Sequence, residues 1–167
     1  MLLDKLDSQC LGYLEKASQF CVQQQHPEVT PEHYLLQLLS NRNNQLNLLL
    51  ESAGIDPVDW IKLLLSQVEN FKDVKSSKPV FAKDLLHWFN RTAGETNGQP
   101  PEKSVQVSHL LLCLWRNPEL YRGRGLHDFD QLSLSEVNTF FNEKIDTDIN
   151  TTNTSNAAPD DDATVLM

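Results

Sequence analysis

The side chains that could do chemistry in this chain are five histidines and three cysteines. The histidines are His26, His33, His87, His109 and His127, and the cysteines are Cys10, Cys21 and Cys113. His33 and His109 could join cysteines as metal ligands, but all three cysteines fall on apolar helix faces. A nucleophilic cysteine needs an exposed, electropositive setting that lowers its pKa. We therefore expect no metal site and no catalytic residue, and we expect His33 and His109 to fix the starts of buried helices through ring hydrogen bonds.

The sequence contains none of the common catalytic motifs, and its net charge is negative where nucleic-acid binding needs positive charge. The chain contains no GxxxxGK[ST] loop, GxGxxG, HExxH or paired CxxC motif, so it lacks the usual cradle for nucleotide phosphates. This predicts a chain that is not itself an enzyme and holds no cofactor. The formal net charge of −9 argues against a nucleic-acid partner, which would require a basic surface.

The location predicted from the sequence is the bacterial cytoplasm. The opening MLLDKLDSQ lacks the basic and apolar regions of a signal peptide. No run approaches the ~18 apolar residues that a membrane span needs, so no membrane is expected as a partner. An odd number of cysteines without a secretion signal indicates reduced thiols.

The spacing of apolar residues predicts an all-α fold. A first helix begins near Asp7 or Ser8, and its buried face repeats at intervals of three and four residues through Cys21. A second helix begins at Thr30-Pro31-Glu32, where Thr30 is the cap and Pro31 suits the first helical position. It is apolar nearly all round from Tyr34 to Leu39 and should be central.

The order of elements then repeats at a constant offset. The segment from Val29 to Leu39 matches the segment from Val105 to Trp115 when shifted by 76 residues, and His33 coincides with His109. Both segments follow an amphipathic helix and precede a short apolar segment and a capped helix. We interpret this as a duplication that forms a pseudo-twofold globule of about four helices in each half. The globule should span residues 1–145, and residues 146–167, rich in Asp, Asn and Thr, should form a disordered linker or tail.

Aromatic residues that flank the apolar faces of two predicted helices suggest a binding surface. Tyr13 and Phe20 flank the stripe of the first helix, and Trp88 flanks that of its repeat equivalent. One interpretation is a hydrophobic groove between these two helices that takes an amphipathic partner helix. Its lining would be Tyr13, Ala17, Phe20, Phe81, Leu85 and Trp88. The alternative is that the aromatic side chains fill the core between the halves.

Over roughly residues 3–145, strongly in the first half and more loosely in the second, the chain resembles the amino-terminal domain of the Clp/Hsp100 family. Leu6, Asp7, Cys10, Leu14, Ala17, Cys21 and Val29 match that family without a gap up to Glu32-His33, where Tyr34 replaces the usual Leu. Within the family the ClpV group of type VI secretion is most similar, through the segment from Glu119 to Leu126 and the following Leu132-Ser-Leu-Ser135.

The resemblance implies a function in protein recognition. The domain would be the monomeric recognition arm of a hexameric AAA+ ATPase, with the ATPase modules in cis. Its partner would be an amino-terminal helix of the large contractile-sheath subunit, and threading by the ATPase would dismantle contracted sheath. Two alternatives remain open: a general substrate or adaptor domain of another Clp-type ATPase, and a small hydrolase or metal protein.

Overall fold

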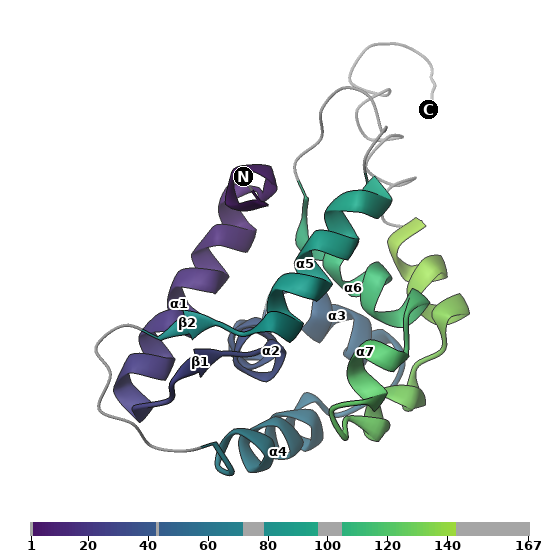
Figure 1. The fold of residues 1–167 in the computed structure, drawn as a ribbon. Coiled ribbons are helices and arrows are strands. Elements are labelled where there is room, and N and C mark those ends of the chain that lie inside the picture. The colour runs from purple at the N-terminus through teal and green to yellow at the C-terminus, as the bar shows by residue number, and fades with distance from the viewer. Residues whose placement is uncertain (1, 43, 72–78, 97–104, 143–167) are drawn as a thin grey trace. The chain divides into compact units, whose positions relative to one another are not determined.

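The computed structural model describes residues 2–42, 44–71, 79–96 and 105–142. The chain divides into two compact units, residues 1–132 and 133–167, and each is described by itself. The first unit is helical apart from one two-stranded sheet (Figure 1), which confirms the predicted all-α class. Its elements are η1 (Leu2–Lys5), α1 (Ser8–Gln24), β1 (Glu28–Val29), α2 (Pro31–Leu39), α3 (Gln45–Ser52), α4 (Pro57–Val68), β2 (Val80–Phe81), α5 (Lys83–Thr96), α6 (Val107–Arg116), α7 (Glu119–Arg122) and η2 (His127–Gln131).

Both predicted helix starts in the first half are present. The Cys10 N–H donates to Asp7 Oδ1 at 2.8 Å, so Asp7 caps α1. Thr30 caps α2 and Pro31 takes its first position, as the sequence indicated. Helix α2 is buried nearly all round and packs against α1, α3, α4 and α5. It is therefore the central helix of the unit.

The backbone pairing displays the internal repeat. Val29 pairs with Phe81 in the parallel β1–β2 sheet, and Leu6 forms an isolated parallel bridge with Val105. Leu6 and Phe81 precede the first helix of their halves, whereas Val29 and Val105 precede the second. Each half thus pairs its first entry strand with the second entry strand of the other half, as a twofold relation requires. The N–H groups of Ala82 and Asp7 donate to the carbonyls of Val29 and Val105, both at 2.9 Å. The double repeat is confirmed.

Aromatic rings join the two halves. The Tyr34 ring on α2 meets the rings of Phe89 and Trp88 on α5 edge-on, at centroid distances of 4.9 and 5.8 Å. Its hydroxyl donates to the Cys10 carbonyl at 3.2 Å. This single side chain therefore contacts the first helix of each half.

The inner face of α4 differs from the one that helical spacing predicts. The apolar residues of this segment recur so that Val58, Ile61, Leu64, Leu65 and Val68 should share one face, but Val58 and Leu65 are 49% and 39% exposed. Trp60 is buried in their place, because its ring stacks on Phe129 at 4.2 Å. Burial of one large indole outweighs burial of two smaller side chains and sets the rotation of the helix.

The second unit contains a helix over residues 134–142. Its predicted capping box is present, since the Glu136 N–H donates to Ser133 Oγ at 3.1 Å and the Ser133 N–H donates to Glu136 Oε1 at 3.0 Å. The predicted domain boundary after residue 145 and the predicted disordered tail lie outside the described residues. In the part of the chain that the structure describes, no helix has both the length and the apolar character that a membrane crossing demands.

Candidate functional site

Most of the side chains predicted to line a groove are in the core instead. Tyr13, Ala17, Leu85 and Trp88 are each 4% exposed or less. The Trp88 indole N–H donates to the Leu110 carbonyl at 2.9 Å, and Tyr13 Oη accepts from the Asn41 side-chain amide at 2.9 Å. Side chains this buried offer almost no surface to a ligand, so the core interpretation holds for these four, of which only Trp88 reaches the wall of a cleft described below. Leu85 and Trp88 are buried because α5 packs against both α6 and α2, and Tyr13 and Ala17 because α1 packs against α2.

The remaining two predicted residues, Phe20 and Phe81, are half-buried. Phe20 packs against the rings of His33 and His26 at centroid distances of 5.9 and 6.4 Å. Phe81 lies in β2, where its backbone pairs with Val29. Neither side chain lines the two clefts described next.

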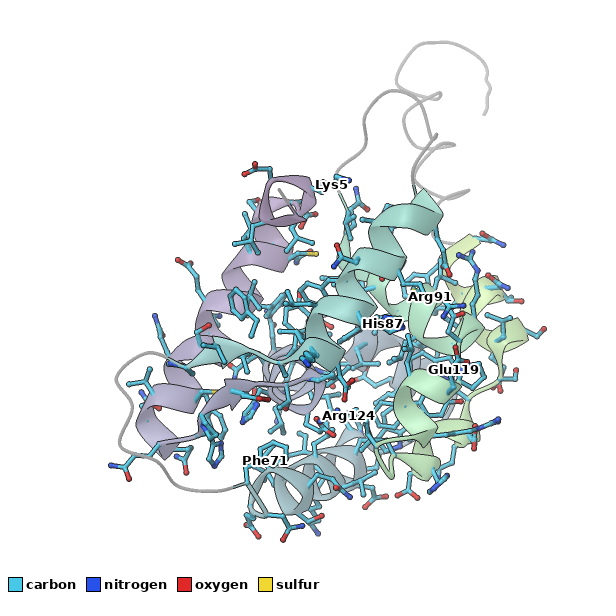
Figure 2. All side chains as sticks on the ribbon, viewed as in Figure 1. Lys5, Phe71, His87, Arg91, Glu119 and Arg124 are labelled. Atoms are coloured by element: carbon cyan, nitrogen blue, oxygen red, sulfur yellow. The ribbon has the colours of Figure 1, made fainter. Side chains whose placement is uncertain are left out.

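A cleft of about 590 Å³ lies where the strands, the end of α4 and the start of α5 converge. Phe71 approaches it from the end of α4 and Arg124 from the segment after α7 (Figure 2). Its remaining lining residues are Pro27, Glu28, Thr30, Asn70, Ala82, Lys83 and Asp84. A second, smaller cleft of about 220 Å³ shares Asp84 and Arg124 with the first. The pair of clefts is the candidate functional site.

Arg124 is the common wall of the two clefts. Its Nε donates to Glu32 Oε2 at 2.8 Å, and its Nη1 donates to Asp84 Oδ2. The Arg124 and Glu32 side chains are 19% and 2% exposed. Burial by itself would lower the pKa of Arg124, but Glu32 and Asp84 outweigh that effect and raise it. Since Glu32 begins α2 and Asp84 begins α5, one guanidinium ties together the central helix and the second half.

Replacing Arg124 with lysine should lower the free energy of unfolding by about 1 kcal/mol. A lysine keeps the charge but loses the planar fork that reaches two carboxylates at once. Urea unfolding of R124K beside R42K, a change at an exposed arginine, would measure the difference. Equal stabilities for the two variants would contradict a bridging role for Arg124.

His33 and His109 cap their helices through the same bond. The Thr30 N–H donates to His33 Nδ1 at 3.0 Å, and the Gln106 N–H donates to His109 Nδ1 at 3.0 Å. A histidine that accepts at Nδ1 carries its proton on Nε2 when neutral. His33 Nε2 therefore donates to His26 Nδ1, 2.9 Å away. Burial, followed by the charges of His26 and Arg124, lowers the pKa of His33 to about 4.

Cys21, His26 and His33 form a buried cluster whose Sγ and ring nitrogens all lie within 4.8 Å of one another. These are metal-ligand types, but a metal ligand needs a free lone pair or a thiolate. His33 Nε2 is protonated, and burial raises the pKa of Cys21 to about 12. The Cys21 thiol donates to the Glu28 carbonyl at 3.5 Å. The cluster is therefore tied to the larger cleft through hydrogen bonds, from Thr30 to His33 and from Cys21 to Glu28, since Thr30 and Glu28 both line that cleft.

The other two cysteines are also buried thiols. Burial raises the pKa of Cys10 and of Cys113. Thiols held protonated are poor nucleophiles. All three cysteines are thus buried, as their positions on apolar helix faces predicted.

Several residues of the site were missed by the sequence analysis. Phe71, Asp84 and Arg124 come from three separate elements and share no motif. The feature of the sequence that could have pointed to Arg124 is its position between Gly123 and Gly125. Two glycines so close together indicate a turn, and Gly125 does adopt the left-handed conformation, with φ of +79°. His26 also gave no signal, since it stands in the loop that ends α1.

The comparisons identify the family. The model of the Clp repeat (R) N-terminal domain matches residues 5–129. The N-terminal domain of the ClpV1 ATPase from the Sci1 type VI secretion system of E. coli EAEC is 31% identical, with a TM-score of 0.71 over 83% of this chain and 84% of that one. A structure described as a peptide from the EAEC Sci1 SciI protein is 32% identical, with a TM-score of 0.71 over 83% and 87%.

A complex of a ClpV N-domain with a VipB peptide has the same fold, with 24% identity and a TM-score of 0.64 over 76% of this chain and 79% of that one. A search of curated proteins found no match. The family match covers three quarters of the chain and includes both repeats. The chain belongs to the Clp repeat (R) N-terminal domain family.

Proposed function

We propose that this chain is the substrate-recognition domain of a ClpV-like AAA+ ATPase. It binds the amino-terminal helix of the large type VI secretion sheath subunit and so directs disassembly of contracted sheath. The observation that carries this proposal is the likeness to two solved structures. One is a ClpV1 N-terminal domain, at 31% identity, and the other is described as a peptide from the SciI protein, at 32% identity. The shared fold and identity support a shared type of ligand.

The larger cleft is suited to one face of a helical peptide. Its volume of about 590 Å³ lies within the ~300–1,000 Å³ common for binding sites. Phe71 and Pro27 are half-buried and offer apolar surface, whereas Glu28 and Lys83 are exposed charges of opposite sign at the rim. An amphipathic helix can bury side chains at i, i+3 and i+4 in such a cleft and leave its polar face in water.

In this proposal the chain supplies recognition, and ATPase modules in cis supply the work of unfolding. Among the residues described beside the cleft, burial keeps the Cys21 thiol protonated and the His33 ring neutral, which supports a role in recognition. The complete protein would act in the bacterial cytoplasm, where contracted sheath is recycled. In this division of labour the domain determines the affinity for the sheath helix, and the ATPase modules determine the rate at which sheath is unfolded.

Calorimetric titration of the domain with the synthetic amino-terminal helix of the sheath subunit tests the proposal. Binding is expected, and F71A should weaken it about tenfold, because a half-buried aromatic lining residue is the kind that dominates peptide affinity. V58A, on the exposed face of α4, should bind as the unchanged domain does. Absence of binding by a folded domain at high micromolar peptide would sink the proposal.

The same titration separates the alternative function. A general Clp-type substrate domain should bind an unfolded model protein in preference to the sheath helix. Competition between the two ligands at equal concentration would therefore distinguish recognition of sheath from recognition of unfolded chains.

A further inference from the structure

The smaller cleft, called here the α5–α7 pocket, is a separate hollow of about 220 Å³. Pro31, Trp88, Leu114 and Leu120 form its apolar part, and Asp84, His87, Glu119, Gly123 and Arg124 complete the lining. Figure 2 shows His87, Glu119 and Arg124 gathered where α5 and α7 approach each other. Sites for drug-sized ligands usually exceed ~300 Å³. A space of this size suits a single large apolar side chain.

The mouth of the pocket carries excess negative charge. The Asp84 and Glu119 side chains are 65% and 63% exposed. The Arg124 guanidinium, 19% exposed, is shared by Glu32 and Asp84. The exposed Lys83 lines the larger cleft, so the charged residues that line this pocket are Asp84, Glu119 and Arg124, which together carry an excess of one negative charge.

The neighbouring ion pairs extend the same pattern. Arg91 pairs with Glu119 at 3.3 Å and with Glu95 at 3.9 Å, and Arg116 pairs with Glu95 at 3.3 Å. In these pairs and those of Arg124, four carboxylates face three guanidinium groups. The excess carboxylate charge lies at the mouth of the pocket, where Asp84 and Glu119 are most exposed. A cation arriving from solution is therefore favoured there over an anion.

We propose that the α5–α7 pocket is a docking site for a basic amphipathic peptide segment. One large apolar side chain of the segment enters the pocket against the half-buried Leu120, and a Lys or Arg three or four residues away pairs with Asp84 or Glu119. Helical spacing places those two side chains on the same face of the segment. The inference concerns a pocket outside the larger cleft and does not require the sheath to be the partner.

Two matched synthetic helical peptides test this docking site. Both carry one central Leu, and one has Lys while the other has Glu at the positions three and four residues away. Titration into the isotopically labelled domain should move the backbone NMR signals of His87, Leu120 and Gly123 with the Lys peptide and leave them in place with the Glu peptide. Sedimentation of the domain alone shows whether a second copy occupies the pocket.

Three variants sharpen the test. E119Q and D84N should each weaken the Lys peptide about two- to fivefold, the usual effect of an exposed charge pair, and L120A should weaken it about tenfold. E15Q, at an exposed glutamate on α1, is the matched control and should change nothing. An unfolding curve for each variant confirms that it is folded.

Equal binding of the two peptides, shifts confined to the larger cleft, or unchanged affinity in E119Q and L120A would each overturn the docking site. Self-association that buries His87 and Leu120 would assign the pocket to a second copy instead. Failure here leaves the sheath titration unaffected, because that experiment is judged by binding to the domain and by F71A in the larger cleft.

Discussion

Replacing Trp88 with alanine should lower the free energy of unfolding by about 3–5 kcal/mol, the usual cost of removing a buried aromatic side chain. Trp88 is 1% exposed. The change deletes ring contacts with Phe89 at 5.3 Å and Tyr34 at 5.8 Å. It also leaves the Leu110 carbonyl without the indole N–H that it accepts at 2.9 Å. Urea unfolding followed by far-ultraviolet circular dichroism measures the loss.

Two further variants keep this prediction decisive if W88A does not fold. W88F retains most of the ring volume and loses the N–H donor, so it should cost about 1–3 kcal/mol. F20A removes a half-buried ring and should cost less than W88A. A W88A domain within about 1 kcal/mol of the original would restore Trp88 to the surface groove that the sequence suggested.

Acidification from near pH 7 to near pH 4 should remove about 3 kcal/mol of stability through His33 alone. Its pKa is about 4 in the folded domain against 6.5 as the ordinary value. The folded state therefore favours the neutral ring, and the unfolded state takes up the proton first. This contribution is intact above pH 6.5 and is lost as the pH falls through 4.

The physical reason lies in the hydrogen-bond chain. Protonation would place an N–H on His33 Nδ1, opposite the Thr30 N–H that now donates to it at 3.0 Å. The new charge would also lie among buried groups beside Arg124, which the structure places close enough to affect this pKa. Acid should thus loosen the start of α2 before it affects the exposed surface.

The variant H33Q isolates the contribution of His33. Glutamine at this position can still accept from the Thr30 N–H, as in a capping box, but it does not titrate. The stability of H33Q is expected to fall by about 3 kcal/mol less than that of the original domain over the same pH interval. Identical pH profiles for the two proteins would show that His33 is not the titrating group.

The sequence by itself determined the elements and their repetition. Thr30-Pro31 and Asp7 predicted helix starts because capping is local. The side-chain oxygen of the cap residue accepts a hydrogen bond from a backbone N–H two or three residues away. The offset of 76 residues anticipated that Val29 and Val105 would hold equivalent places. The ring bonds of His33 and His109 also span only three residues, so their spacing could be recognised in the chain.

Only the tertiary structure decided which faces are covered and where a ligand could lie. Trp88 and Trp60 each stand beside an apolar stripe, and their burial depends on Tyr34 and Phe129, partners from distant segments. The clefts arise where Arg124 meets Glu32 and Asp84, which are 92 and 40 residues away along the chain. Helical periodicity reports one face of one helix at a time. The packing of several helices around a shared guanidinium has no such local signal, so the clefts could be located only from the fold.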